Sequence, residues 1–533
     1  MTSSSNEQQR EVTEYRILAL YRFLPLVDTT NQRNNSNHSN NNTSSNDDNN
    51  TFTAAANAAA DVESWDEKTL MKHPERHPQL VQLQSELYST LRKYETRGTL
   101  LIAPEGINGT ICYPHPPPIT AQDHDSQQLI NNNNNNNDDP VKTYLTTHPL
   151  FGGSNLRTRS SIWTQPHHQN AFQRLKIKIK PEIVTLGLGR PITDHTTHIP
   201  TPHPQRHAQN ELANPNIIKG TYLNPRQWDD AMKDPDVLVI DTRNSYEIEI
   251  GTFESAVDPC TQHFSEFPEY LERLAGDFDW SGLNGELVEN GGKNDGDDGV
   301  VSNVCNESAQ QQQQQQQQQL VGKKKKTPPK AIAMFCTGGI RCEKATSYAL
   351  QSNLFPKNLP IYHLEGGILS YLDDVAKRNE PNSNDDDDDD TDEKKQQDSS
   401  TFHGECFVFD KRVALTEGLE PSNKYISCHG CRGPMDRRLL EDNGGSVDKS
   451  SVEYDSVALE GKKKYEQLLM GIRKLPPLTF DTESQKWYVP GLTCPRCHDG
   501  TTRESFERFA QRKEQMEICA REGKSHFQDN GRK

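Results

Sequence analysis

The stretch Ala-Ile-Ala-Met-Phe-Cys-Thr-Gly-Gly-Ile-Arg-Cys-Glu-Lys, residues 331–344, decides the fold of the central part of this chain. It begins with a short apolar run that is typical of a buried parallel strand, and the periodic pattern of Cys342 to Leu354 predicts a helix. Between them, Gly338 and Gly339 allow the backbone to curl so that several amide N–H groups converge, and the helix N-terminus adds partial positive charge there. The order strand, loop, helix predicts an α/β domain with an anion-binding loop.

Cys336 is the first residue of this loop and the candidate nucleophile. The thiolate is the reactive form of cysteine, and a cradle of amide N–H groups favours it near neutral pH. The same cradle suits an anionic substrate or a persulfide. The alternative is a buried thiol at a strand end, but a core cysteine does not require the glycines and the arginine that follow. The residues predicted to bind the substrate or anion are Thr337, Gly338, Gly339 and Ile340.

Arg341 and Cys342 complete the predicted catalytic set. Four residues separate Cys336 from Arg341, whereas a cysteine phosphatase needs five to wrap a tetrahedral phosphate, so phosphatase chemistry is disfavoured. Cys342 lies at the helix start, close enough in sequence to act as a resolving thiol or a second catalytic group. A cysteine packed within the helix is the alternative.

The N-terminal third alternates strand-like and helix-like segments between asparagine-rich stretches. The expected elements are strands over 16–26 and 99–103, an amphipathic helix over 79–94, a turn and strand over 104–111, a segment over 144–151 and a strand over 174–181. This order predicts a small α+β domain of ferredoxin-like or acylphosphatase-like type.

Two polar residues beside a glycine turn of this domain are candidate substrate contacts. Glu105 lies at a strand end, from which an acidic side chain reaches a bound substrate, and Asn108 lies in the turn. The alternative is that the turn residues only supply positive φ angles.

Lys176, Lys178 and Lys180 alternate along the last of these strands, so they share one face, where they would meet phosphates. The alternative is an ordinary solvated face.

Two Cys-x-x-Cys pairs near the C-terminus predict a structural zinc site. The pairs are Cys428 with Cys431 and Cys494 with Cys497, separated by 62 residues. Four thiolates close a tetrahedral site, and together the two pairs are a stronger signal than either alone. Reduced, unligated thiols are the alternative. The reserve ligands are Cys406, His429, His498 and Cys519.

The amino-acid composition limits how much of the chain folds into compact domains. With 533 residues and 32% hydrophobic content, the chain suffices for two or three modest domains separated by disordered insertions. The formal charge of −17 is uneven, because residues 379–400 alone hold ten acidic and two basic side chains. No stretch approaches the apolar length of a membrane span, and no signal core or transit peptide is evident, so we expect a cytoplasmic protein. In that compartment the 11 cysteines are better explained as thiols and metal ligands than as a disulfide framework.

Two further segments give the central domain a resemblance to the rhodanese fold. The segment 237–243, continuing through Glu247 to 251–256, is similar to the rhodanese signature upstream of the active loop, although Thr252 stands where a His is usual. The segment 362–368, Tyr-His-Leu-Glu-Gly-Gly-Ile, resembles the strand and turn that close that domain. The resemblance implies that three residues support the site structurally: Asp241, Arg243 and Glu247.

The order of all these parts resembles the bacterial-type tRNA uridine hydroxylases. That resemblance implies a tRNA-modifying oxidoreductase that uses O2 to convert the wobble uridine in the anticodon loop to 5-hydroxyuridine, with no organic cofactor evident. The chain is also similar to eukaryotic thiosulfate sulfurtransferase-like proteins, which leaves sulfur transfer from thiosulfate or a sulfur donor protein as one alternative and a non-catalytic binding module as another. The long insertions and widely spaced cysteine pairs depart from the compact bacterial form.

We therefore predict four regions. They are an N-terminal α+β domain over 1–205, a rhodanese domain over 211–378 with an insertion at 281–330, an acidic disordered linker at 379–400, and a cysteine-rich zinc-binding region at 401–533. In the hypothesised mechanism, the Cys336 thiolate adds to C6 of a splayed uracil, and Arg341 and the loop amides orient the ring or a phosphate.

Overall fold

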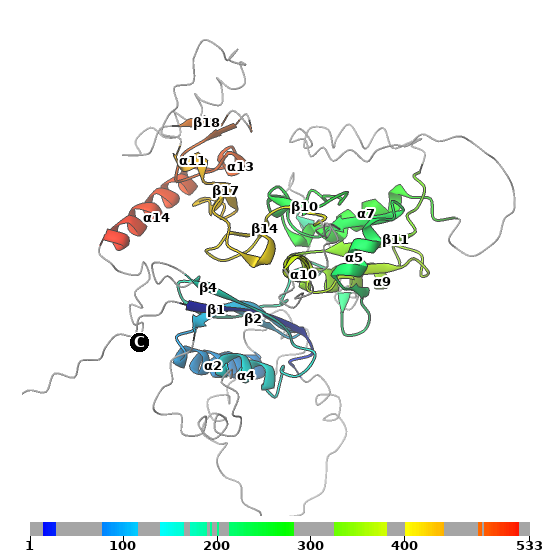
Figure 1. Ribbon diagram of the computed structural model, residues 1–533, viewed down its shortest axis with the longest axis horizontal. Coiled ribbons are helices and arrows are strands. Elements are labelled where there is room, and N and C mark those ends of the chain that lie inside the picture. Colours follow the sequence, from blue (N-terminus) through cyan, green and yellow to red (C-terminus); the bar gives the residue numbers. More distant parts are fainter. Residues whose placement is uncertain are drawn as a thin grey trace, which may run out of the picture. The chain divides into compact units, whose positions relative to one another are not determined.

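The computed structural model of the chain falls into two compact units, residues 1–185 and residues 186–533 (Figure 1). The described residues are 14–27, 77–115, 139–164, 171–188, 192–193, 200–201, 213–281, 325–380, 400–441, 478–481, 484 and 486–521. Most of the predicted insertions and of the predicted linker lies outside these ranges. Among the described residues, no helix is long and apolar enough to span a membrane.

The first unit is a five-stranded sheet with two helices. Its strands lie in the order β4-β1-β3-β2-β5, antiparallel except where β5 runs parallel to β2. The first four follow the ferredoxin-like order, so the predicted α+β domain is confirmed. The elements are β1 Glu14–Phe23, α2 Pro78–Lys93, β2 Arg97–Ala103, β3 Gly106–Pro114, α4 Pro140–Thr147, β4 Arg157–Thr164 and β5 Leu175–Ile179.

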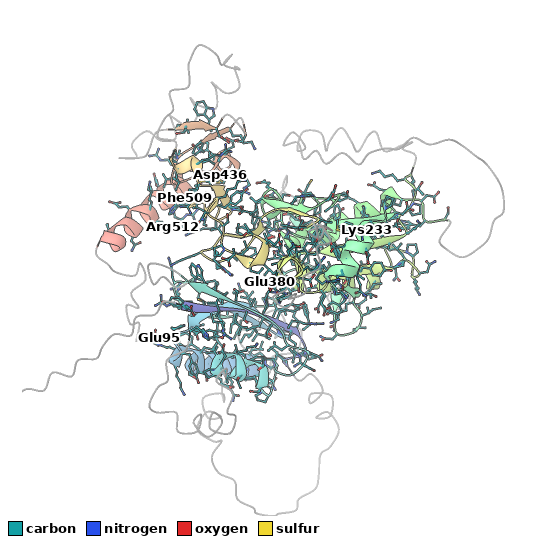
Figure 2. All side chains as sticks on the ribbon, in the orientation of Figure 1. Glu95, Lys233, Glu380, Asp436, Phe509 and Arg512 are labelled. Atoms are coloured by element: carbon teal, nitrogen blue, oxygen red, sulfur yellow. The ribbon has the colours of Figure 1, made fainter. Side chains whose placement is uncertain are left out.

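α2 packs on this sheet through a stripe of leucines spaced three or four residues apart. These four are Leu80, Leu83, Leu87 and Leu91, all buried. Burial of each contributes about 2 kcal/mol relative to exposure. The helix ends where Glu95, labelled in Figure 2, takes a left-handed φ of 52°. The second helix, α4, is capped at its N-terminus by Asp139, whose carboxylate accepts hydrogen bonds from the N–H groups of Val141 and Lys142 at 3.1 and 3.0 Å.

The lysines of β5 lie on the sheet face opposite α2. Ile177 belongs to the core beneath the helix, so Lys176 and Lys178 on either side of it point the other way. Lys178 and Lys180 are exposed, whereas Lys176 is half-buried. The alternation predicted for these lysines is therefore present.

The second unit is built on a parallel sheet in the order β8-β12-β11-β9, so the predicted α/β architecture with a parallel sheet is confirmed. Its strands are β8 Thr221–Leu223, β9 Val237–Asp241, β11 Ala331–Phe335 and β12 Ile361–Leu364. Its helices are α5 Pro225–Met232, α6 Ser245–Ile248, η5 Phe264–Glu266, α7 Phe267–Asp277, α9 Ile340–Gln351 and α10 Gly367–Asn379. Every residue of β11 is buried, which explains its continuous apolar run.

The chain beyond residue 400 continues this packing. β10 Gly251–Phe253 pairs with β13 Phe402–Gly404, and Phe402 and Cys406 belong to the same core cluster as Phe335. The hydroxyl of Tyr371 lies 2.7 Å from an Asp229 carboxylate oxygen and accepts from the Thr401 N–H at 3.0 Å. These contacts tie the start of the C-terminal region to the parallel-sheet part.

The remaining C-terminal elements are short hairpins and helices. They are β14 Cys406–Phe407, β15 Ala414–Leu415, η7 Glu417–Leu419, β16 Tyr425–Ser427, β17 Pro434–Asp436, α11 Arg438–Glu441, β18 Thr479–Asp481, β19 Lys486–Tyr488, α13 Pro495–His498 and α14 Arg503–Arg521. A small hairpin of β6 Ile192–Thr193 and β7 Pro200–Thr201 precedes the parallel sheet. The β16–β17 loop carries Cys428 and Cys431. Cys494 is the N-cap of α13, and Cys497 lies within that helix.

Candidate active site

Cys336 lies at the carboxyl end of β11, where the strand turns into α9. Its side chain is fully buried, and its Sγ accepts a hydrogen bond from the Gly339 N–H at 3.1 Å. Gly339 has a left-handed φ of 96°, which glycine adopts without strain, and it is the N-cap of α9. The loop therefore aims a backbone donor and a helix N-terminus at the sulfur, as the sequence predicts.

The surroundings of Cys336 favour its thiolate. Burial is the largest influence and raises the pKa, but hydrogen bonding by Cys342, the positive charge of Arg341 and the N–H groups of Cys342 and Gly339 outweigh it and lower the pKa of Cys336 to about 6. A thiolate in a buried, donor-lined loop is the expected form of a cysteine nucleophile.

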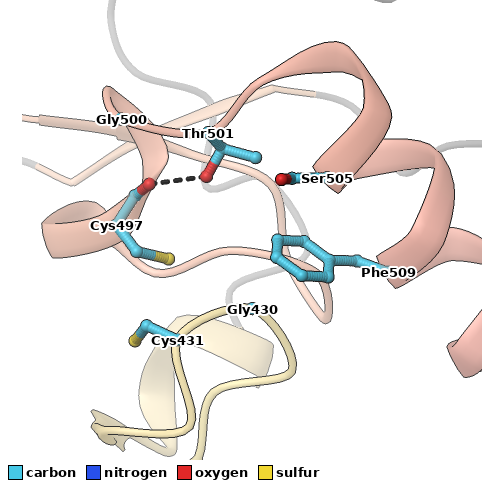
Figure 3. A pocket seen from close by; sticks show the side chains of 7 residues that line it. All are labelled: Gly430, Cys431, Cys497, Gly500, Thr501, Ser505 and Phe509. Atoms are coloured by element: carbon cyan, nitrogen blue, oxygen red, sulfur yellow. Dashed lines mark hydrogen bonds between the residues drawn. The ribbon is translucent and has the colours of Figure 1, made fainter. Parts of the chain in front are cut away.

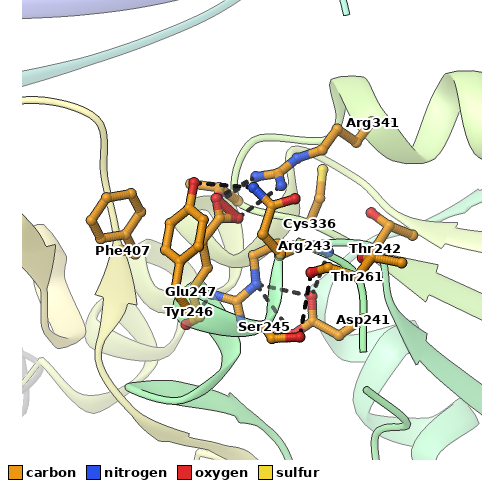
Figure 4. A network of polar contacts seen from close by, with 12 residues as sticks. Asp241, Thr242, Arg243, Ser245, Tyr246, Glu247, Thr261, Cys336, Arg341 and Phe407 are labelled. Carbon is orange, nitrogen blue, oxygen red and sulfur yellow. Dashed lines mark hydrogen bonds and ion pairs between the residues drawn. The ribbon is translucent and has the colours of Figure 1, made fainter. Parts of the chain in front are cut away.

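Arg341 is held in place by a buried ion pair with Glu247. Two guanidinium nitrogens lie 2.7 and 3.2 Å from the carboxylate oxygens of Glu247, a bidentate arrangement (Figure 4). Arg341 Nη2 also lies 3.4 Å from Thr337 Oγ1. Because Glu247 is fully buried and holds the guanidinium of Arg341 in place, the positive charge of Arg341 stays near Cys336 Sγ.

Asp241 and Arg243 form a second buried pair behind this one. Arg243 Nε and Nη2 donate to the two carboxylate oxygens of Asp241 at 2.9 and 2.6 Å, and Nη2 also donates to the Gly251 carbonyl at 2.6 Å. Thr252, which stands where a His is usual, donates its hydroxyl to Asp241 at 2.9 Å. These contacts join β9 to β10, and a supporting role of Asp241 and Arg243 in the site stays a prediction.

The first turn of α10 clamps the active loop from the other side. The N–H groups of Ile368 and Leu369 donate to the carbonyls of Cys336 and Thr337 at 2.9 and 3.1 Å. Gly367 has a φ of +65°, and a Cβ there would lie only 2.4 Å from the Cys336 carbonyl oxygen. Only glycine fits this close approach, which explains the second glycine of the segment 362–368.

Cys342 is buried in the first turn of α9. Burial is the largest influence on it, and burial together with its contact to Cys336 raises the pKa of Cys342 well above its usual value. Cys342 is therefore the protonated member of the pair and donates to the Cys336 thiolate. Thr242 Oγ1 lies 3.6 Å from its sulfur and donates to the Phe335 carbonyl at 3.0 Å. The sequence did not single out Thr242 because its contact with Cys342 spans 100 residues.

In the first compact unit, Glu105 and Asn108 both hydrogen-bond to the backbone of Ile183. Glu105 accepts from the Ile183 N–H at 2.7 Å, and the Asn108 side-chain amide donates to the Ile183 carbonyl at 2.9 Å. They thus hold the segment after β5 against the β2–β3 hairpin. A substrate contact by either residue stays a prediction.

The two Cys-x-x-Cys pairs meet in space. The four sulfur atoms of Cys428, Cys431, Cys494 and Cys497 lie within 4.8 Å of one another. Three of the sulfur–sulfur separations are 3.7, 3.7 and 3.8 Å. Zinc–sulfur bonds of ~2.3 Å in a tetrahedron place sulfurs about 3.8 Å apart, so the cluster has the size of a four-cysteine zinc site.

Three of the four reserve ligands have described side chains, and none of these three belongs to the cluster of four cysteines. Cys406 packs in the core of the parallel-sheet part, where burial raises its pKa to about 12. His498 places Nδ1 3.0 Å from Thr493 Oγ1, and burial lowers the pKa of His498 to about 4. His429 is not part of the group either, and the side chain of Cys519 lies outside the described residues. Cys260 is disulfide-bonded and is thus an exception to the expected free thiols.

Comparison with known proteins places the chain in a family. Residues 75–183 match the UPF0176 acylphosphatase like domain. The chain is 32% identical over 452 residues to the tRNA uridine(34) hydroxylase of Teredinibacter turnerae, an alignment that covers 85% of this chain and 89% of that protein. A solved Rhodopseudomonas palustris protein of unknown function, described as a possible tyrosine phosphatase, shares 18% identity over 33% of this chain and 95% of its own, with a TM-score of 0.17. The chain belongs to the tRNA uridine(34) hydroxylase family.

Proposed function

We propose that this enzyme hydroxylates uridine 34 of tRNA at C5, with Cys336 as the nucleophile. The observation that carries the proposal is the match to a tRNA uridine(34) hydroxylase along 85% of the chain. The buried thiolate cradle supports it, because it supplies a nucleophile that is ionised at neutral pH. The wobble base lies in a single-stranded loop, where it can be splayed out and enter such a site.

The proposed reaction begins with addition of the Cys336 thiolate to C6 of the uracil ring. The new Sγ–C6 bond displaces the electron pair of the C5–C6 double bond onto C5 and the O4 carbonyl. C5 then takes one oxygen atom derived from O2, and the other oxygen leaves as water with two electrons and two protons from an external reductant. Loss of the C5 proton expels the thiolate and restores the double bond, so the cysteine is regenerated.

The other loop residues have separate proposed roles. Arg341, oriented by Glu247, places positive charge where the carbonyl oxygen of the ring or a phosphate becomes more negative. Cys342 donates to the Cys336 thiolate and stabilises it before attack. The loop Thr337 to Ile340 surrounds the substrate or anion, the N–H groups of Gly339 and Cys342 donate to the sulfur, and Asp241 with Arg243 positions β9 behind it.

We further propose that the parallel-sheet part is a rhodanese domain and that the four cysteines hold a structural zinc. The strand–loop–helix arrangement around Cys336 and the clamp by the 362–368 turn support the first proposal. The sulfur–sulfur separations of 3.7 to 3.8 Å support the second. A zinc there would crosslink the β16–β17 loop to α13.

The test is to incubate the purified protein with unmodified tRNA, O2 and a reductant, then to digest the tRNA and quantify nucleosides by mass spectrometry. The expected product is 5-hydroxyuridine at position 34 alone. Parallel incubation with thiosulfate and cyanide measures sulfur transfer. Rapid thiocyanate formation with no hydroxylated uridine would contradict the proposal and favour a sulfurtransferase.

A further inference from the structure

A pocket of about 310 Å³ opens beside the cysteine cluster (Figure 3). Its wall includes Cys431 and Cys497, and α14 contributes the ring of Phe509 and the hydroxyl of Ser505. Gly500 lines it as well, and a Cβ at that residue would meet no atom within 4 Å. The volume lies at the lower end of the range for ligand sites, roughly 300–1,000 Å³.

Two arginines lie over the ring of Phe509, and the charge of a third, Arg432, acts on one of them. The guanidinium carbons of Arg508 and Arg512 lie 6.0 and 5.7 Å from the ring centroid. Arg512 donates to the His429 carbonyl at 3.0 Å, and Arg508 donates to Ser505 Oγ at 2.9 Å. Burial, followed by the charges of Arg432 and Arg508, lowers the pKa of Arg512, so the three positive charges are close enough to repel one another.

No described carboxylate neutralises this positive charge. Within the described part of the chain, no ion pair involves Arg432, Arg508 or Arg512. Arg496, the arginine between Cys494 and Cys497, is instead paired with Glu249 at 2.9 Å. Arg503, also on α14, is paired with Glu507 at 3.1 Å. Arg508 and Arg512 therefore place positive charge beside the Phe509 ring that no described carboxylate pairs with, and this charge is available to an external anion.

We propose that this pocket binds one single-stranded nucleotide of the substrate tRNA, which rests on the proposed function. The base stacks on Phe509, and the attached phosphate is bound by Arg508, Arg512 and Arg432. An aromatic platform flanked by guanidinium groups is the usual means of holding an unpaired nucleotide without reading its sequence. An acidic peptide would use the arginines but not the ring. The pocket thus acts as an anchor for tRNA separate from the Cys336 loop.

The test measures binding of unmodified tRNA to full-length variants over a range of salt concentrations. Arg508→Glu should weaken binding about tenfold and flatten the salt dependence, whereas Arg503→Glu, the same charge change on the same helix, should have little effect. Phe509→Leu should weaken binding about tenfold, and Phe509→Tyr should retain it because the stacking surface remains. Gly500→Trp should block the pocket, with Gly276→Trp as control, since a Cβ at Gly276 also meets open space.

The results separate this inference from the proposed function. Melting temperature and zinc content are measured for every variant, so that a loss of binding is assigned to the pocket only where both are unchanged. If the wild type hydroxylates tRNA but the Arg508, Phe509 and Gly500 variants bind it as tightly as their controls, the pocket inference is wrong and the function stands. If a polyglutamate peptide binds as well as tRNA and loses affinity equally in Arg508→Glu, the site is a general anion surface and the inference is also wrong. If the wild type neither binds nor hydroxylates tRNA, both fail.

Discussion

At the scale of single residues, the ionisation of Cys336 sets the reactivity of the proposed site. Its pKa of about 6 means that roughly ten thiolates exist for each thiol at pH 7. Because the thiolate is the nucleophile, we expect kcat/KM to rise with pH up to about 6 and to level off above it. The measurement is the pH profile of hydroxylation together with the alkylation rate of Cys336 resolved by mass spectrometry.

The matched variants Cys342→Ala and Cys342→Ser sharpen this prediction. Removal of the donor in Cys342→Ala should move the rising limb to higher pH, because the hydrogen bond that lowers the Cys336 pKa is lost. The serine retains a hydroxyl donor and should shift the limb less. Identical profiles for both variants and the wild type would show that Cys342 does not control the ionisation.

Gly367 gives a second prediction at this scale. Gly367→Ala places a Cβ against the carbonyls of Cys336 and Thr337 at 2.4 and 2.7 Å, so the active loop must shift. We expect kcat/KM to fall about 100-fold, since such a displacement misaligns the nucleophile. Gly276→Ala, where the added Cβ meets open space, is the control and should retain full activity. Wild-type activity in Gly367→Ala would show that the clamp is not needed.

At the scale of secondary-structure elements, the sequence predicts local features well and long-range contacts poorly. The strand, loop and helix around Cys336 follow from an apolar run, two glycines and a periodic segment, all adjacent in sequence. The pairing of Arg341 with Glu247 spans 94 residues, and its geometry follows only from the parallel alignment of β9 and β11. Likewise, β13 lies in the C-terminal region predicted to be separate, yet it pairs with β10, and the ring of its Phe402 packs against Phe253.

The exposed face of β5 carries a prediction of its own. Lys178 and Lys180 point away from α2 and are exposed, so we expect them to contact tRNA phosphates. The double substitution Lys178→Glu with Lys180→Glu should weaken tRNA binding about tenfold and lower the salt slope by about 1.5. The same charge change on the other side of the sheet, Arg92→Glu with Lys93→Glu on α2, is the control. Equal binding by both double variants would identify the β5 face as merely solvated.

At the scale of the whole molecule, the cysteine cluster joins segments separated by 62 residues. We expect about one zinc per chain by elemental analysis, and we expect chelation to unfold the C-terminal region, because the small hairpins around it have little core of their own. Hydrogen exchange before and after chelation locates the loss. A metal-free protein whose four thiols are freely alkylated while these hairpins stay protected would contradict the zinc site.

The central claim is that Cys336 attacks the wobble uridine, and one measurement tests it most directly. Wild type, Cys336→Ser and the control Cys112→Ala, which alters a cysteine in the other compact unit, are each incubated with unmodified tRNA, O2 and reductant, and 5-hydroxyuridine at position 34 is quantified by mass spectrometry. Serine has a far higher pKa and gives no anion in the same cradle, so we predict that product is absent for Cys336→Ser, with an unchanged melting temperature, and present for the other two. Full product formation by a folded Cys336→Ser variant would contradict the account.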